Sequence, residues 1–98
     1  PLMQLLLTYD VNTATPEGRR RLRNMAKLCE GYGLRVQKSV FEITCSQAGL
    51  LELIDSANRI IDAANDSVRI YRLPADGLTE VKVFGTAKIY PHSDALVL

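Results

Sequence analysis

Five basic residues stand without an acid among them in a nine-residue stretch, residues 19–27: Arg19, Arg20, Arg21, Arg23 and Lys27. They give this stretch a charge of +5, whereas the other 89 residues hold seven basic and eleven acidic side chains, which sum to −4 and leave the chain at +1. A local positive excess is typical of a surface that binds anions, and nucleic acid is the first candidate. The alternative is a helix face whose charges are only solvated.

A single acid precedes this basic stretch. Asp10 directly follows the apolar segment 4–9, and a polar loop separates it from the arginines. Taken by itself, an aspartate at the end of a strand forms an Asx turn or a cap. Its position beside a cationic helix raises the question of whether it also does chemistry.

Several other site chemistries are disfavoured by the residues. The chain has no GxxxxGK[ST] motif, and Gly31-Tyr32-Gly33 follows a helix instead of joining a strand to a helix, so no P-loop is predicted. A Ser-His-Asp triad would depend on His92, the one histidine. Cys29 and Cys45 lack CxxC spacing and are predicted to be buried apolar residues. The segment LRVQKSVFE has one Phe and no glycine, unlike the aromatic strand of an RNA-recognition module.

The elements that must position these residues follow from hydrophobic spacing. Residues 4–9 predict a buried strand, and Thr15 and Pro16 predict the start of a helix over 16–32, with Arg19, Arg23 and Lys27 as an outward stripe. Residues 34–43 predict a strand, a second helix begins after Thr44 or Ser46, and residues 67–73 and 80–85 predict two more strands. The apolar residues 95–98 are expected to add a strand to a neighbour.

We predict an α+β fold, the ferredoxin-like βαββαβ arrangement with a short extra C-terminal strand and both helices on one face of an antiparallel sheet. The 98 residues suit one domain, and Pro1 and Leu2 before Met3 are expected to be the remnant of a cleaved expression tag. No apolar run is long enough to cross a membrane and no signal peptide is evident, so we expect a cytoplasmic protein with no membrane partner.

On its segments LLTYDVNT, GRRRLR and LRVQKSVFE, the sequence resembles the second CRISPR-associated protein family, the small ferredoxin-like member of the spacer-acquisition machinery. The resemblance runs from Met3 through the C-terminal strand. It implies a homodimer in which Asp10 of each subunit holds a shared divalent cation, Mg²⁺ or another such as Mn²⁺. It also implies an endonuclease that acts on duplex DNA or on RNA, and a partner in the CRISPR integrase subunit.

The resemblance assigns a role to further residues. Asp10 is expected to be the catalytic residue and metal ligand, and Tyr9, Ser39 and Phe41 are expected to support it. The residues expected to bind nucleic acid are Arg19, Arg20, Arg23, Lys27 and Arg35.

The function predicted from the sequence is therefore a metal-dependent endonuclease, because a carboxylate-bound Mg²⁺ can polarise a phosphoryl oxygen and lower the pKa of a water molecule. Two alternatives stay open. One is a non-catalytic DNA-binding scaffold of the CRISPR integrase complex, which differs only in lacking cleavage. The other is a ferredoxin-like sensor of a small anionic metabolite, which would need a ligand pocket at the dimer seam in place of an exposed cationic surface.

Overall fold

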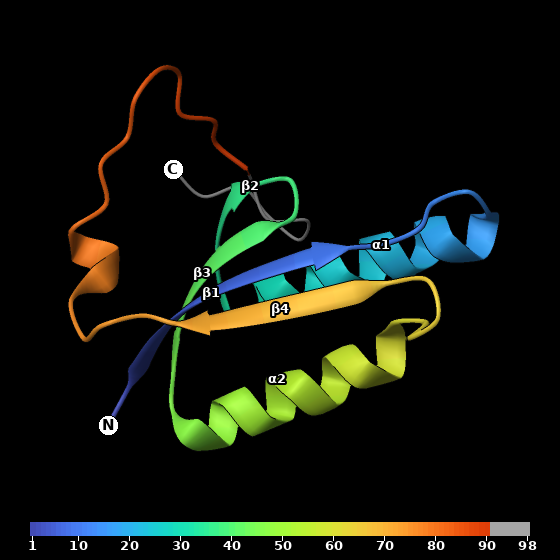
Figure 1. Cartoon of the computed structure of the whole chain (residues 1–98), viewed down its shortest axis with the longest axis horizontal. Coiled ribbons are helices and arrows are strands. Elements are labelled where there is room, and N and C mark those ends of the chain that lie inside the picture. The colour runs from blue at the N-terminus through green and yellow to red at the C-terminus, as the bar shows by residue number, and fades with distance from the viewer. Residues whose placement is uncertain (91–98) are drawn as a thin grey trace.

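Four strands and two helices make up the part of the chain that the structure, a computed structural model, describes, residues 1–90 (Figure 1). Along the chain the elements are β1 (Met3–Asp10), α1 (Pro16–Glu30), β2 (Gly33–Gln37), β3 (Val40–Cys45), α2 (Gln47–Ile60) and β4 (Ser67–Arg72), followed by a short 3₁₀ turn, η1 (Gly77–Thr79). The strands form one antiparallel sheet in the order β2-β3-β1-β4. This is the predicted α+β fold with the βαββαβ order.

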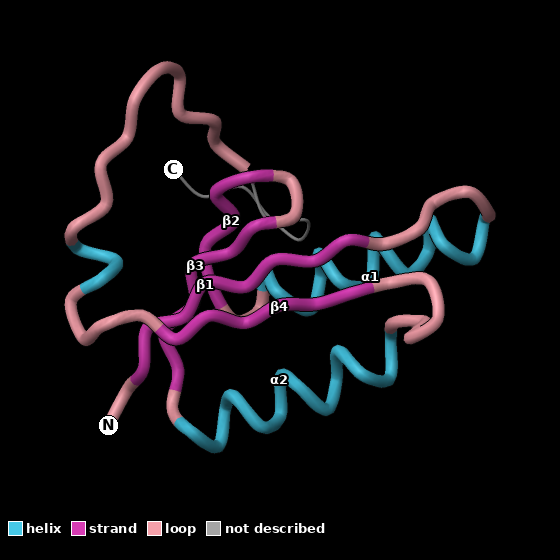
Figure 2. Tube along the Cα trace, viewed as in Figure 1, coloured by secondary structure: helices cyan, strands magenta, loops and turns pink. Residues whose placement is uncertain are grey.

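The core lies between the sheet and the two helices. In β1 every second residue is buried, whereas the residues between them are partly exposed, as expected for a central strand covered on one face. Both helices therefore lie against the same face of the sheet, and no helix covers the opposite face within residues 1–90 (Figures 1 and 2). The most buried contributions are Leu5 and Leu7 from β1, Phe41 and Ile43 from β3, Met25 and Cys29 from α1, and Leu53 from α2.

Side-chain caps fix where the helices begin. The Thr15 hydroxyl accepts a hydrogen bond from the Gly18 N–H at 3.1 Å, and Pro16 occupies the first turn, as predicted. Of the two residues predicted to open the second helix, Ser46 is the cap, because its hydroxyl accepts from the Gly49 N–H at 3.1 Å. Thr44 instead belongs to β3, where it pairs with Gln4.

Residues 34–43 do not form a single strand, and this prediction is wrong. They fold into the β2–β3 hairpin, with Lys38 and Ser39 in the turn. Leu34 pairs with Glu42 and Arg35 with Phe41, whereas Gln37 pairs with Val40, because the register shifts between Arg35 and Gln37. The extra residue of this shift leaves odd-numbered residues opposite odd-numbered residues over most of the hairpin, so a pattern of period two does not reveal the turn.

The predicted strand over 80–85 is also wrong, because residues 80–90 have no regular secondary structure. Val83 and Phe84 are exposed there, and no strand within residues 1–90 pairs with this segment. A short β-rich sequence forms a strand only where a sheet edge receives it. The predicted extra strand at 95–98, and His92, lie outside the described residues.

The two cysteines differ. Cys29 is buried, as predicted, and desolvation raises its pKa to about 12, so this thiol is not a nucleophile at neutral pH. Cys45 is only partly buried, because it lies at the last position of β3. In residues 1–90 no helix has the length and apolar character to span a membrane.

Candidate functional site

Asp10 is the last residue of the central strand, and its side chain is exposed. Its backbone pairs with Ser67 of β4, and on the other side the Tyr9 N–H donates to the Ser39 carbonyl at 3.1 Å. The Asp10 carboxylate takes part in no hydrogen bond or ion pair with residues 1–90. The strand thus presents an accessible carboxylate whose place is set by the main chain.

Tyr9 and Phe41 lie beneath this strand end, within the core. Their rings stack with centroids 6.1 Å apart, and the Tyr9 hydroxyl donates to the Lys38 carbonyl at 3.3 Å. Burial raises the pKa of Tyr9, so the phenol stays protonated at neutral pH. Ser39, in the same turn, is partly buried beside Tyr9. Tyr9 and Phe41 therefore lie on the core side of the strand end, where they can shape the site, whereas Ser39 lies in the partly exposed turn of the hairpin.

Arg35 is engaged within the protein. Its Nε and Nη2 both donate to the Lys38 carbonyl, at 3.0 and 2.7 Å, and its guanidinium lies 3.7 Å from the Glu30 carboxylate. The same group lies 5.7 Å from the centre of the Phe41 ring and 5.3 Å from that of Tyr90. Arg35 thus holds the β2–β3 turn closed, and its predicted contact with nucleic acid stays a prediction.

The residues of α1 that were predicted to bind nucleic acid are all exposed: Arg19, Arg20, Arg23 and Lys27. Arg19 donates from Nη1 to the Thr13 carbonyl at 3.1 Å, whereas Arg20, Arg23 and Lys27 form no ion pair with a carboxylate of residues 1–90. This basic surface, defined as these four residues, is separated from Asp10 only by the loop 11–15, to which Arg19 is hydrogen-bonded.

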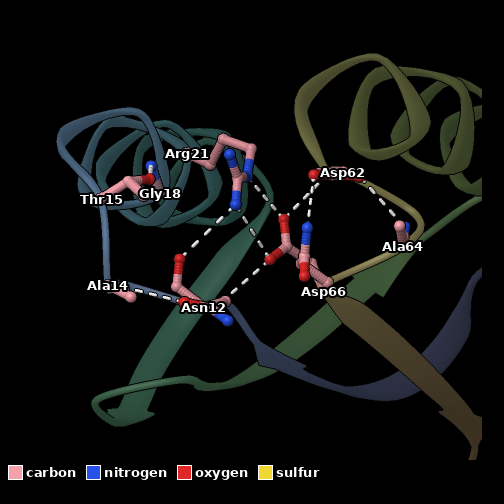
Figure 3. A network of polar contacts seen from close by, with 9 residues as sticks. Asn12, Ala14, Thr15, Gly18, Arg21, Asp62, Ala64 and Asp66 are labelled. Atoms are coloured by element: carbon pink, nitrogen blue, oxygen red, sulfur yellow. Dashed lines mark hydrogen bonds and ion pairs between the residues drawn. The ribbon is translucent and has the colours of Figure 1, made fainter.

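Arg21 points elsewhere, into a polar network shown in Figure 3. Its Nε donates to Asp66 Oδ2 at 2.7 Å and its Nη2 to Asp66 Oδ1 at 3.3 Å. Asp66 Oδ1 also accepts from the Asn12 N–H at 3.0 Å, and Oδ2 from the Asp62 N–H at 2.9 Å. The Asp66 side chain is fully covered, and the hydrogen bond from Arg21 is the main cause that lowers the pKa of its carboxyl.

In the sequence, Arg21 is one of the five cations of residues 19–27, and nothing marks Asp66 as its partner. No local signal links them, because they are 45 residues apart and meet only when α1 lies beside the loop before β4. The one hint was a second short acidic segment, Asp62 to Asp66, at the end of a predicted helix. The free basic surface therefore holds four of the five cations.

The number of metal-binding side chains near Asp10 limits how this strand end could bind a metal ion. Within residues 1–90 no three His, Cys, Asp or Glu side chains gather in a group that could hold a metal. One chain thus offers a single exposed carboxylate at this strand end. That carboxylate suits a hard ion that keeps most of its waters, and a second carboxylate would have to come from another molecule.

Comparisons with known proteins agree at the level of sequence and of fold. Residues 3–81 match the model of the family described as CRISPR associated protein Cas2. The CRISPR-associated endoribonuclease Cas2 3 of Rhodospirillum rubrum is 53% identical over 94 residues, covering 96% of this chain and 99% of that protein. The CRISPR-associated endonuclease Cas2 of Halalkalibacterium halodurans is 41% identical over 95 residues, covering 97% and 99%. The crystal structure of Streptococcus pyogenes Cas2 at pH 6.5 superposes with a TM-score of 0.77 at 47% identity, over 85% of this chain and 100% of that one.

Proposed function

Because this chain belongs to the CRISPR-associated protein Cas2 family, we propose that it is a divalent-metal-dependent endonuclease that hydrolyses duplex DNA or RNA in CRISPR spacer acquisition. Relatives that match nearly its whole length are named endoribonuclease or endonuclease, which supports a nuclease. The observation that carries the proposal is the exposed Asp10 carboxylate at the end of the central strand, free of hydrogen bonds to residues 1–90 and separated along the chain from the basic helix α1 only by the loop 11–15.

In this proposal the residues of the site have different roles, according to where they lie. Arg19, Arg20, Arg23 and Lys27 attract the phosphate backbone, because exposed cations on one helix face neutralise phosphates without reading bases. Asp10, one from each of two copies, would hold Mg²⁺ or Mn²⁺. When bound, such an ion polarises a phosphoryl oxygen and lowers the pKa of a water. Tyr9 and Phe41 keep the strand end packed, and Arg35 fixes the neighbouring turn.

Assembly is part of the proposal. A single chain supplies one carboxylate to this site, so the metal site is complete only in a homodimer. We further propose that the CRISPR integrase subunit is a partner of this dimer. A non-catalytic scaffold would use the same basic surface and the same partner, and differs only in lacking cleavage.

The test compares Asp10→Asn with the matched control Asp76→Asn, which changes an exposed aspartate in the loop before η1. Purified proteins are given duplex DNA and single-stranded RNA with Mg²⁺, and binding of Mn²⁺ is followed by titration calorimetry. Asp10→Asn should abolish cleavage and metal binding and should leave duplex affinity within about twofold, because α1 supplies the binding. Asp76→Asn should behave as the wild type.

Two results would overturn the proposal. If Asp10→Asn cuts as fast as the wild type, Asp10 is not the metal ligand of the reaction. If the wild type binds duplex DNA but cleaves neither substrate with Mg²⁺ or Mn²⁺, the protein is a scaffold.

A further inference from the structure

We propose that Arg21 and Asp66 are positioning residues that hold Asp10 in place, by tying the end of β1 to the start of β4 through one buried carboxylate. This inference rests on the proposed function of Asp10. It assigns to Arg21 a role different from that of the other cations of α1.

The need for such a pair follows from the isolation of Asp10. No residue among 1–90 donates a hydrogen bond to its carboxylate, so the side chain takes its direction from the backbone alone. Asp10 is also the last residue of its strand, where the ladder to Ser67 ends. Strand ends fray unless the chain that leaves them is fixed.

Asn12, two residues beyond Asp10, is where the chain is fixed. Its N–H donates to Asp66 Oδ1 at 3.0 Å, and its side-chain Oδ1 accepts from the Ala14 N–H at 2.9 Å. The Arg21 Nη2 donates to the Asn12 carbonyl oxygen at 3.5 Å, and the first turn of α1 approaches the same oxygen closely at Gly18. Figure 3 shows these groups converging on Asn12 from α1 and from the loop before β4.

The same carboxylate fixes the opposing strand. Asp66 directly precedes Ser67, the register partner of Asp10, and its Oδ2 also accepts from the Asp62 N–H. Asp66 therefore joins three backbone segments: the exit from β1, the entry to β4, and the end of α2. Its side chain is fully covered, and the Arg21 side chain is 19% exposed, so the pair is largely buried and does not belong to the basic surface of α1.

The chemistry of the pair explains the choice of residues. A buried carboxylate with two backbone donors still needs a counter-charge, and a guanidinium supplies two N–H groups in a fixed plane. Lysine could neutralise Asp66 but would present a single point charge, so it could not hold both carboxylate oxygens in the same way. Arg21→Lys should therefore restore part of what Arg21→Ala removes.

The experiment is a double-mutant cycle of Arg21→Ala and Asp66→Asn, with Arg21→Lys added. The matched control is Arg59→Ala, which breaks the exposed Asp55–Arg59 pair of α2. Three properties are measured for each folded variant: the Mn²⁺ dissociation constant, the duplex dissociation constant, and hydrogen exchange of the Asn12 and Ser67 amides.

We expect each single variant to weaken Mn²⁺ binding about 10-fold, the low end of the effect of removing a direct partner of a metal ligand, because the pair acts on Asp10 through the backbone. The double variant should bind Mn²⁺ no more weakly than the single variant that has the larger dissociation constant, because both changes break the same ion pair. Exchange at Asn12 should rise, duplex affinity should stay within about twofold of the wild type, and Arg59→Ala should change nothing. Arg21→Lys should fall between Arg21→Ala and the wild type, and it also serves as the folded variant if Arg21→Ala does not fold.

The results that would overturn this inference differ from those that would overturn the proposed function. If Arg21→Ala weakens duplex binding as much as Arg23→Ala does and leaves Mn²⁺ binding and Asn12 exchange unchanged, Arg21 is a phosphate contact and the inference is wrong. If the wild type binds no divalent ion, the proposed function fails, and the inference is then decided by exchange alone. In that case faster exchange at Asn12 and Ser67 in both variants supports it, and unchanged exchange overturns it.

Discussion

At the scale of single residues, the structure separates the groups that can meet a ligand from those that hold the protein together. Asp10, Arg20 and Arg23 are exposed, whereas Tyr9 and Phe41 are buried. Of the residues that the family resemblance assigns to one site, some are therefore on the surface and others are in the core. The buried ones can influence activity only through the position of the strand end.

Asp66 makes a residue-scale prediction about acid stability. Its pKa is lowered in the folded protein, chiefly by the hydrogen bond from Arg21, so the unfolded chain binds a proton more readily than the folded one. The stabilisation is therefore complete above the unfolded pKa of about 3.9 and is lost as the pH falls through that value toward the lower folded pKa. Urea unfolding at pH 7 should show Asp66→Asn to be less stable than the wild type, and this difference should shrink below about pH 4.

Arg21→Ala tests whether the hydrogen bond from Arg21 is the cause of the lowered pKa of Asp66. Removing the guanidinium removes the main reason for the lowered pKa of Asp66, so the difference from the wild type should again shrink in acid. A difference that is constant from pH 7 to pH 3 in both variants would mean that Asp66 does not couple stability to pH.

At the scale of elements, the close contact between α1 and the loop 11–15 sets the distance between the basic surface and Asp10. A Cβ atom added at Gly18 would lie 1.9 Å from the Asn12 carbonyl oxygen, so no other residue fits without moving the helix or the loop. The capped first turn of α1 therefore packs directly against the loop that follows β1.

Gly18→Ala should therefore destabilise the protein by about 1–3 kcal/mol, the usual cost of overpacking. Gly31→Ala is the matched control, because Gly31 has φ −72° and ψ −16° and an added Cβ would make only ordinary contact with the Leu28 carbonyl at 3.4 Å. There the change should be neutral or should stabilise by about 0.4–1 kcal/mol. Thermal unfolding of both variants tests this, and equal melting temperatures would show that the loop yields freely to the helix.

The basic surface of α1 predicts how binding responds to salt. Each phosphate neutralised on duplex DNA adds about 0.9 to the slope of log affinity against log salt. Replacing Arg19 and Arg23 by Ala should lower that slope by about two units if each meets one phosphate. Arg21→Ala should leave it unchanged, because its guanidinium is bound to Asp66. Fluorescence anisotropy over a salt series measures the slope, and an unchanged slope in the Arg19 and Arg23 double variant would place the binding surface elsewhere.

At the scale of the whole molecule, one face of the sheet is covered by helices and the other is not (Figure 1). Residues 81–90 and the β2–β3 hairpin enclose a groove of about 990 Å³ lined in part by Leu34, Val81, Val83 and Phe84. The exposed fraction of Phe84 is 88%, and that of Leu34 is 60%. Apolar side chains gathered in this way are typical of an interaction surface.

We expect this groove to be covered in the proposed homodimer. Burial of a Phe side chain contributes about 1.5–3 kcal/mol, so Phe84→Ser should weaken the dimer at least about 10-fold. Leu51→Ser, on the outer face of α2 and 58% exposed, should leave it unchanged. Light scattering over a concentration series distinguishes the two. A wild-type protein that is monomeric at micromolar concentration would contradict the dimer itself.

Local signals in the sequence are enough to predict the helix starts, the central strand and the exposed cations of α1, because caps and hydrophobic periodicity are local properties. They also place Asp10 at a strand end. They do not reveal the β2–β3 turn, because the register shift between Arg35 and Gln37 leaves residues of the same parity opposite each other over most of the hairpin, so residues 34–43 have the pattern of one strand.

The contacts of the charged residues depend on the tertiary structure. Arg21 and Arg23 look alike in the sequence, yet one is bound to a covered carboxylate 45 residues away and the other is exposed. Arg35 likewise donates to a carbonyl of its own hairpin. The reason is that an ion pair depends on which loops lie side by side, and that is set by the packing of the whole sheet against both helices, not by neighbours in the chain.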